Sequence, residues 1–309
     1  MAYTWRATYC FDYPLLDTPI DLGDIRLYPG PPELDSKPHA VHFYEFQTES
    51  VDRNGQVEAR SKYLERLEKL SELSVLCPYY TEVSFHSAVL IDADGTAGYP
   101  PSGINFNFGG KPYVPPGQPP KKLREELEQA AQPFIKLQNL NSVVGESISR
   151  ALRWLYRAND YRLSADDQLI YRWIAFNSLY SLLDDLEGIN RSERQSVRNF
   201  EEKFRPNIGT IRNSAVQKLA ASGLKLIRGN NKDVSKNLTQ ALVGTDLITQ
   251  CALECVYAAR CSLFHGAEGP VSHVPNAALQ AAASFLETYL KQAIGSLVSF
   301  CENIQKGSP

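Results

Sequence analysis

The sequence contains no run of about 18 consecutive apolar residues, the length that a helix needs to cross a bilayer. Its first residues lack the pattern of a secretory signal, a positively charged stretch followed by an apolar one. Cysteine is sparse, with six residues in 309, and three of the six (Cys251, Cys255 and Cys261) fall in one helical pattern. This usage is typical of reduced cysteines in a core or interface. We therefore expect a cytoplasmic protein without disulfides.

Motifs for nucleotide and metal binding are also missing. The stretch "NFGGKP" lacks the G-x-x-x-x-G-K-[ST] frame of a phosphate-binding loop, which argues against hydrolysis of ATP or GTP. Cys251 and Cys255 lie four residues apart, but the sequence brings no third and fourth ligand near them. His39 and His42 would point to opposite faces of an alternating strand. We expect no metal site and no cofactor.

The sequence up to about Gly110 predicts strands separated by turns. Stretches rich in aromatic and β-branched residues end in Gly, Pro or Asp, which is typical of strands: "YTWRATYCFDYP", "DIRLYPG", "HAVHFYEFQTES", "YTEVSFHSAVLIDADG" and "GINFNFGG". One amphipathic helix is expected between them, over about Val57 to Leu73. Residues 1–110 are therefore predicted to form a small α+β domain, whose function the sequence leaves unassigned.

A proline-rich segment, residues 111–121, separates this part from the rest of the chain. Five prolines fall between Pro112 and Pro120, and proline fixes φ and removes hydrogen-bond donors. We predict a stiff linker here.

Residues 122–309 predict an all-α helical bundle. The 3.6-residue period indicates helices over Lys122–Leu137, Ser142–Ala158, Ala165–Leu186, Ser192–Phe204, Thr210–Ala221, Asp246–Phe264 and Asn276–Ile304. Ser164 and Thr245 are placed to cap two of these helices, and Pro133 is expected to kink or split the first. The more polar residues 187–244 are typical of an insertion.

The predicted helix near residues 246–265 is apolar on two sides. Its wider face is that of a core helix, and a second strip is formed by Leu253, Tyr257 and Phe264. Such a helix needs two partners. The second could be the insertion, the N-terminal domain or another copy of the chain.

Arg260 and His265 border this second strip, about 140° apart around the helix. Gly266 then provides the left-handed position that commonly ends a helix, where the dipole favours a protonated His265. By themselves, an arginine at a helix edge and a histidine in a last turn are common structural choices.

Two motifs point further. "RCSLFHG" resembles the R-x4-6-H motif of HEPN domains, and "YRWIAFNSLYSLL" resembles the helix that precedes this motif in the Apea-like branch. The resemblance covers about residues 122–305. It implies that Arg260 and His265 are catalytic, that Asn177 is the polar residue of the upstream helix, and that Tyr257, Cys261 and Ser262 support them. It also implies a metal-independent endoribonuclease, acting as a homodimer on single-stranded RNA in microbial defence or a toxin-like stress response.

The dimer seam would then consist of Leu253, Tyr257 and Phe264, with the N-terminal domain sensing a ligand or partner. Histidine and arginine suit the chemistry, because RNA cleavage without a metal needs a proton carrier near neutral pH and a fixed cation on the phosphate. The residue after the motif arginine is often Asn, however, and here it is Cys261, a poor hydrogen-bond donor. A non-catalytic RNA- or nucleotide-binding module and a structural dimerisation protein therefore stay open as alternatives.

Charge adds a weaker indication. The net charge of −3 combines an acidic excess before residue 140 with a basic excess after it, so the C-terminal part is the better candidate for binding a polyanion. A basic, aromatic-rich track for a single strand is suggested by "YRANDYR" together with Arg150, Arg153, Arg172, Arg191, Arg194 and Arg198.

Overall fold

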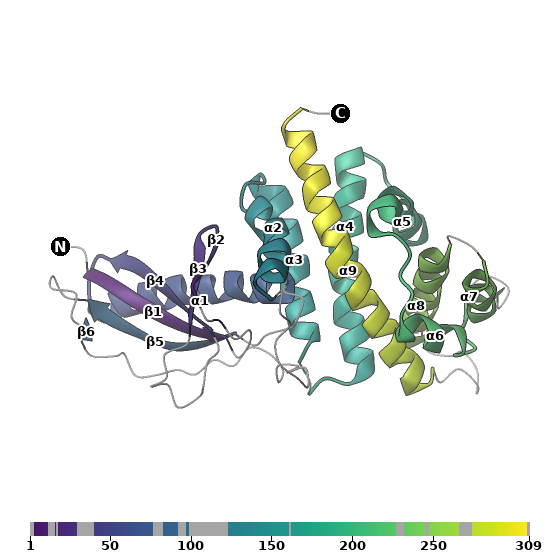
Figure 1. Cartoon of the computed structure of the whole chain (residues 1–309), viewed down its shortest axis with the longest axis horizontal. Helices are drawn as coiled ribbons and strands as arrows, with labels where there is room; N and C mark the ends of the chain where they lie inside the picture. Colours follow the sequence, from purple (N-terminus) through teal and green to yellow (C-terminus); the bar gives the residue numbers. More distant parts are fainter. Residues whose placement is uncertain are drawn as a thin grey trace. The chain divides into compact units, whose positions relative to one another are not determined.

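The computed structural model describes residues 3–11, 16, 18–29, 40–76, 83–91, 97–98, 123–160, 162–226, 232–244, 247–265 and 274–307. The chain divides into two compact units, Met1–Gln138 and Asn139–Pro309. The first is an α+β unit built on an antiparallel sheet, and the second is a helical bundle, as the sequence predicts (Figure 1). The predicted linker at 111–121, the predicted strand "GINFNFGG" and the proposed cap Thr245 lie outside the described residues.

The sheet of the first unit is antiparallel throughout its described part, with β1 near its middle. Its order is β2 (Ile20–Leu22), β3 (Ile25–Pro29), β4 (Ala40–Thr48), β1 (Tyr3–Phe11), β5 (Val83–Ile91) and β6 (Ala97–Gly98). The alternating sequence of β1 buries Trp5, Ala7 and Tyr9 on one face, as a half-buried strand requires. The short strand β2 was not predicted; it pairs with β3 across a turn in which Gly23 has φ 78°.

Helix α1 (Arg53–Leu76) packs against β1, β4 and β5 through its apolar side chains, including Tyr63, Leu67 and Leu70. It begins four residues earlier than the sequence predicts. The reason is local, because the Asp52 carboxylate accepts hydrogen bonds from the backbone N–H groups of Asn54 and Gly55 and so caps the first turn.

Helix α2 (Leu123–Leu137) groups with the first unit, although the sequence analysis assigned it to the bundle that starts at residue 122. It packs against α1 and β2, and Gln138 just after it donates a hydrogen bond to Asp24 over 2.6 Å. Pro133 lies inside this helix and does not split it.

The second unit is arranged around three long helices that lie side by side, α3 (Ser142–Ala158), α4 (Ala165–Glu187) and α9 (Asn276–Gln305) (Figure 1). Ser164 caps α4, as predicted, because its hydroxyl accepts a hydrogen bond from the backbone N–H of Asp167. Phe176 of α4 packs edge-on against Phe200 and Tyr289, with ring centroids 5.4 and 5.6 Å away. These aromatic rings form the centre of the bundle.

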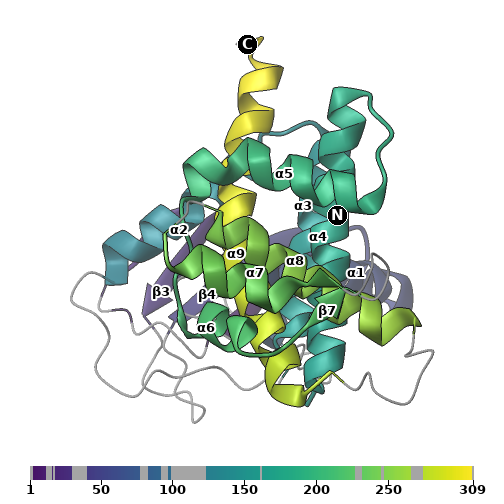
Figure 2. The same cartoon turned by 90° about the vertical axis from the view of Figure 1, so that its right-hand side faces the viewer.

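The described residues of the segment 187–244 belong to this bundle and pack against α8 (Ile248–His265), which also contacts α4 and α9 (Figure 2). They form α5 (Glu193–Ile208), α6 (Ser214–Ala220), the short hairpin β7 (Lys225–Leu226) and β8 (Lys232–Asp233), and α7 (Val234–Leu242). The hairpin and α7 were not predicted. In the described segments no helix combines the length and hydrophobicity that a membrane span requires.

Candidate functional site

Arg260 lies where α8, α4 and α5 meet. Helix α8 is anchored in the bundle by its buried residues Ala252, Cys255, Val256 and Ala259. This packing turns Arg260 toward α4, and its side chain is 18% exposed. The guanidinium therefore sits at the edge of the core and does not extend into solvent.

One carboxylate oxygen collects the polar groups of this region. Oε1 of Glu193 lies 3.1 Å from Nη2 of Arg260, and it accepts hydrogen bonds from the indole N–H of Trp173 over 3.1 Å and from the hydroxyl of Tyr180 over 3.2 Å. Trp173 and Tyr180 are buried. Glu193 was not predicted from the sequence, because nothing local distinguishes it from an ordinary acidic residue in the first turn of a helix.

A capping box holds the start of α5 and hence the position of Glu193. The Ser192 side chain accepts the backbone N–H three residues on, and the Gln195 side chain accepts the backbone N–H of Ser192 over 3.1 Å. Glu193 is then the first residue of the helix, where the helix dipole favours a negative charge.

Aromatic rings surround the guanidinium of Arg260. Its central carbon lies 4.6 Å from the ring centroid of Phe264 and 5.6 Å from that of Trp173, within the range of cation–π attraction. The ring of Tyr257 lies 5.8 Å from that of Trp173. These contacts fix the position and orientation of the Arg260 guanidinium group.

Both tyrosines near the cluster remain protonated at neutral pH. Burial raises the pKa of Tyr180, and the neighbouring Glu193 carboxylate raises it further. Burial also raises the pKa of Tyr257 to about 12, together with the side chain of Cys261, with which Tyr257 is hydrogen-bonded. Each phenol is therefore a hydrogen-bond donor and not a base.

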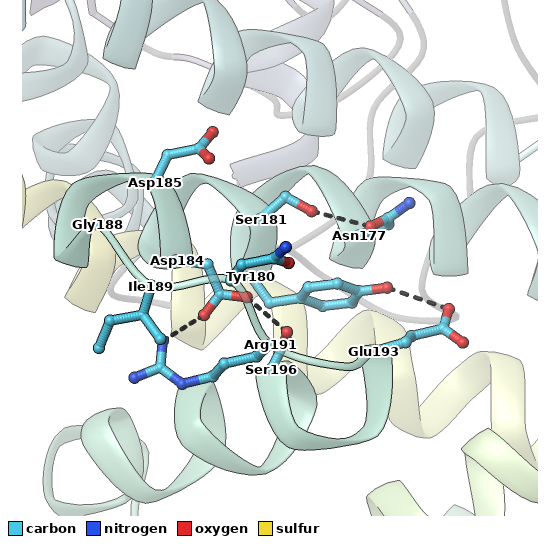
Figure 3. A pocket seen from close by; sticks show the side chains of 11 residues that line it. Asn177, Tyr180, Ser181, Asp184, Asp185, Gly188, Ile189, Arg191, Glu193 and Ser196 are labelled. Carbon is cyan, nitrogen blue, oxygen red and sulfur yellow. Dashed lines mark hydrogen bonds and ion pairs between the residues drawn. The ribbon is translucent and has the colours of Figure 1, made fainter.

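A hollow of about 640 Å³ opens beside this cluster, which is within the usual size of a ligand pocket (Figure 3). Glu193 and Tyr180 form part of its wall. The remaining lining residues come from the end of α4, the following turn and the start of α5: Asn177, Ser181, Asp184, Asp185, Gly188, Ile189, Asn190, Arg191 and Ser196. Glu193 thus borders the hollow on one side and Arg260 on the other.

Asn177 lies in this hollow and is exposed, one helical turn beyond Trp173 on α4. Its carbonyl oxygen accepts a hydrogen bond from the Ser181 hydroxyl over 3.1 Å, as Figure 3 shows. Trp173 of one predicted motif and Arg260 of the other therefore contact the same carboxylate oxygen of Glu193, and Asn177 lies one helical turn from Trp173 at the adjoining hollow.

The side chains of the two residues after Arg260 form hydrogen bonds within α8. Cys261 is half-buried and hydrogen-bonded to Tyr257. The Ser262 hydroxyl donates to the backbone carbonyl of Ala258 over 2.9 Å, a common arrangement for serine in a helix.

His265 is the last residue of α8. Its side chain lies outside the described part of the structure, as does Gly266.

The predicted dimer seam is covered in part by the chain itself. Leu253 is 2% exposed because α5 packs over it, with Val197 among its neighbours. Leu253 is therefore a core residue, and its assignment to a seam between two copies was wrong. Of the other seam residues, Tyr257 is half-buried and Phe264 is 51% exposed. The insertion, one of the partners considered for this strip, occupies its first part.

The predicted basic track is largely neutralised by carboxylates. Arg172 is buried and paired with Glu287 over 2.7 Å. Arg194 and Arg198 both lie within 3.6 Å of Glu254. Further pairs of the track are Arg153 with Glu146, Arg162 with Asp160, and Arg191 with Asp184 and Glu187.

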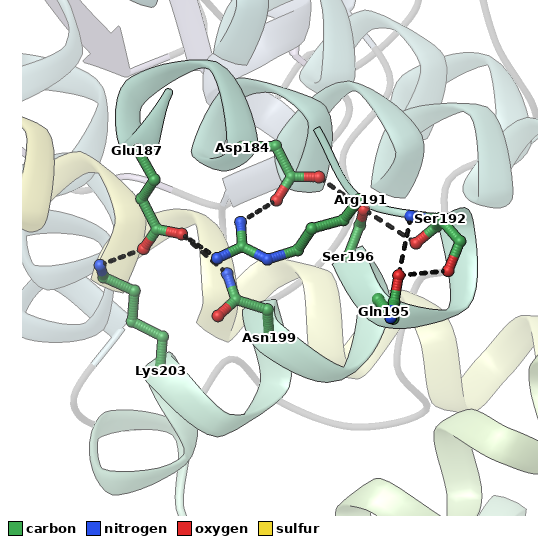
Figure 4. A network of polar contacts seen from close by, with 8 residues as sticks. All are labelled: Asp184, Glu187, Arg191, Ser192, Gln195, Ser196, Asn199 and Lys203. Carbon is green, nitrogen blue, oxygen red and sulfur yellow. Dashed lines mark hydrogen bonds and ion pairs between the residues drawn. The ribbon is translucent and has the colours of Figure 1, made fainter. Parts of the chain in front are cut away.

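The pairs of Arg191 belong to a network that ties the turn after α4 to α5 (Figure 4). Glu187 accepts hydrogen bonds from Lys203 over 2.6 Å and from Asn199 over 3.1 Å, and Ser196 donates to Asp184. These contacts fix α5, and with it Glu193, against α4.

Within the described segments, His, Cys, Asp and Glu side chains nowhere gather in groups of three or more that could hold a metal ion. The chain matches no family model, no curated protein and no solved structure.

Proposed function

We propose that the helical unit is a metal-independent endoribonuclease of the HEPN type, in which Arg260 and His265 act on the RNA backbone. The observation that carries the proposal is the convergence of the two motifs. Arg260 of α8 and Trp173 of α4 bind the same oxygen of Glu193, and Asn177 lies one turn away at the adjoining hollow.

In this mechanism His265 accepts the proton of the ribose 2′-hydroxyl, and the oxygen attacks the adjacent phosphorus. The bond to the 5′ oxygen breaks, and that oxygen takes up a proton. The products carry a 2′,3′-cyclic phosphate and a 5′-hydroxyl. Arg260 stabilises the negative charge that develops on the phosphate. DNA is not cut, because it lacks the attacking hydroxyl.

The test is incubation of a mixed single-stranded RNA with the full chain in EDTA, followed by analysis of the product ends. Wild-type protein should give cyclic-phosphate ends, whereas His265→Ala and Arg260→Ala should leave the RNA intact. His86→Ala, a change at an exposed histidine of β5, is the matched control and should cut as the wild type does. Cleavage by His265→Ala at the wild-type rate would refute the mechanism.

The active form in this proposal is a homodimer in the cytoplasm, with Tyr257 and Phe264 at the seam and the two Arg260 side chains facing one groove. Phe264 supports it, since a large apolar side chain that is 51% exposed beside the motif arginine is suited to a contact between copies. Light scattering that found only monomers over the working concentration range would exclude a composite site. By the resemblance, the enzyme serves in microbial defence or a toxin-like stress response, and the N-terminal unit senses a ligand or partner.

A second candidate is a module that binds RNA or a nucleotide without cutting it. The ion pair of Arg260 with Glu193 and the bond of Cys261 to Tyr257 favour it, because both engage groups that a catalytic site would offer to phosphate. Fluorescence anisotropy with a labelled RNA separates the two candidates. Binding that disappears in Arg260→Ala, with the RNA still intact after incubation, would favour the module.

A further inference from the structure

The geometry points to an oxyanion site in the wild-type fold that is occupied by an internal ligand, the carboxylate of Glu193. We propose that a phosphate oxygen of the substrate takes the place of Glu193 Oε1, with Arg260, Trp173 and Tyr180 as its three binding groups. The choice of phosphate rests on the proposed function, whereas the site itself rests on the contacts.

Three donors converge on one carboxylate oxygen. An ion-paired guanidinium nitrogen, an indole N–H and a phenol O–H all lie 3.1 to 3.2 Å from the same carboxylate oxygen. They come from α4 and α8, whereas the carboxylate comes from α5. Donors that converge on one oxygen from a rigid frame form the arrangement that binds an oxyanion.

The three donors also depend on Glu193 for their charge balance and for a hydrogen-bond acceptor. Without Glu193 the three remaining groups carry one positive charge and no negative one. Trp173 and Tyr180 are 2% and 4% exposed, so they would lack hydrogen-bond acceptors if the carboxylate left and nothing replaced it. The Nε of Arg260 is buried and has no hydrogen-bond partner among the residues that the structure describes. The arginine is thus incompletely satisfied by its present pairing.

The hollow leaves room for the Glu193 side chain to move away from the three donors. Its side chain is 30% exposed and forms part of the wall of the hollow, so rotation about its side-chain bonds can bring the carboxylate toward solvent. In Figure 3 the Tyr180 hydroxyl points at the Glu193 carboxylate from within this wall. The backbone need not move, because the capping box of α5 uses Ser192 and Gln195.

Glu193 is therefore an internal competitor of the substrate. With the carboxylate in place, an incoming phosphate meets a neutral pair. With the carboxylate displaced, it meets Arg260 and two aligned donors. This arrangement sets a threshold for binding and makes Trp173 and Tyr180 substrate-binding residues.

The test uses inorganic phosphate as the probe and the full chain as the protein, with binding followed by titration calorimetry. Glu193→Ala removes the competitor and should bind phosphate about tenfold more tightly than wild type, since it no longer gives up a charge-assisted contact. Glu202→Gln, an exposed change on the same helix, should bind as the wild type does.

Two second changes in the Glu193→Ala background identify the donors. Tyr180→Phe and Arg260→Lys should each lose most of the gain. If Glu193→Ala unfolds, Glu193→Gln takes its place, because it keeps the side-chain shape and removes the charge. Phosphate binding that is unchanged or weaker in the variant that folds would overturn the inference and make Glu193 a support for Arg260.

RNA cleavage measured on the same samples separates this inference from the proposed function. Tighter phosphate binding without any cut RNA would support the oxyanion site and contradict the proposed ribonuclease activity. Cut RNA with unchanged phosphate binding would support the proposed ribonuclease activity and contradict the oxyanion site.

Discussion

In the first unit, Nε of Arg66 donates a hydrogen bond to Nε2 of His42 over 3.1 Å. The other ring nitrogen of His42 lies 2.9 Å from the carbonyl oxygen of Arg26, to which it must donate. The ring is therefore neutral, with its proton on Nδ1. Burial lowers the pKa of His42 to about 4, and the positive charge of Arg66 contributes to the shift.

This pair predicts a stability that depends on pH. In the unfolded chain the pKa of histidine is near the ordinary value of 6.5, so between about pH 6.5 and 4 the unfolded state binds more protons than the folded one. Stability should therefore fall as the pH falls through this window, by roughly 3 kcal/mol at most. Urea unfolding at several pH values measures it.

The matched variant for that experiment is His42→Gln, which cannot titrate. It should be less stable than wild type at pH 7 but should lose less stability on acidification. The ion pair of Arg66 with Asp24 also loses stability on acidification, but only at lower pH, because the pKa of Asp24 is lowered in the fold. Equal slopes for the two proteins between pH 6.5 and 5 would show that His42 does not titrate as described.

Truncation of Leu253 should lower the stability of the fold strongly, and truncation of Phe264 should lower it only slightly. Leu253→Ala removes a fully packed side chain under α5 and should cost about 2 to 5 kcal/mol of unfolding free energy. Phe264→Ala removes a half-exposed ring and its contact with Arg260, and should cost about 1 kcal/mol or less. Any dimer should weaken in Phe264→Ala. Urea unfolding and light scattering on both variants decide the point, and a mild effect of Leu253→Ala would contradict its burial.

Local signals explain which helices were predictable from sequence. The bounds of α3 were predicted at both ends, since an amphipathic run follows Asn141, whose side chain accepts the N–H of Val144. The Ser164 cap of α4 was equally local. Helix α7 has only nine residues after Asp233, and so short an apolar period is hard to distinguish within a polar stretch.

Glu193 could not be identified in this way. Its partners Trp173 and Tyr180 lie 20 and 13 residues earlier in the chain, and Arg260 lies on another helix again. The same is true of Leu253, whose burial depends on how α5 folds back over α8. A helical wheel gives the direction of a side chain, but the neighbour that it meets depends on tertiary packing.

The indole N–H of Trp173 makes a contribution that can be isolated. Trp173→Phe keeps an aromatic ring beside Arg260 but leaves Glu193 with one donor fewer, and it should cost about 1 to 3 kcal/mol. Trp154→Phe is the control, because Trp154 is only half-buried and packs at a tilt against Tyr171, a ring contact that survives the change. Thermal unfolding of the two variants gives the comparison. Equal melting temperatures would mean that the bond to Glu193 contributes nothing.

A change at Cys261 can test the proposed ribonuclease activity through an increase in rate. The motif that this stretch resembles often has Asn at this position, and an amide donates hydrogen bonds that a thiol gives only weakly. Cys261→Asn should therefore speed RNA cleavage, by about tenfold if one additional hydrogen bond forms to the phosphate in the transition state. Cys261→Ser is the matched control, because its hydroxyl can keep a bond to Tyr257 but is too short to replace the amide. Single-turnover cleavage in EDTA gives the rates. If Cys261→Asn cuts more slowly while Cys261→Ser cuts as the wild type does, the side chain at 261 serves to pack against Tyr257 and not to hold phosphate.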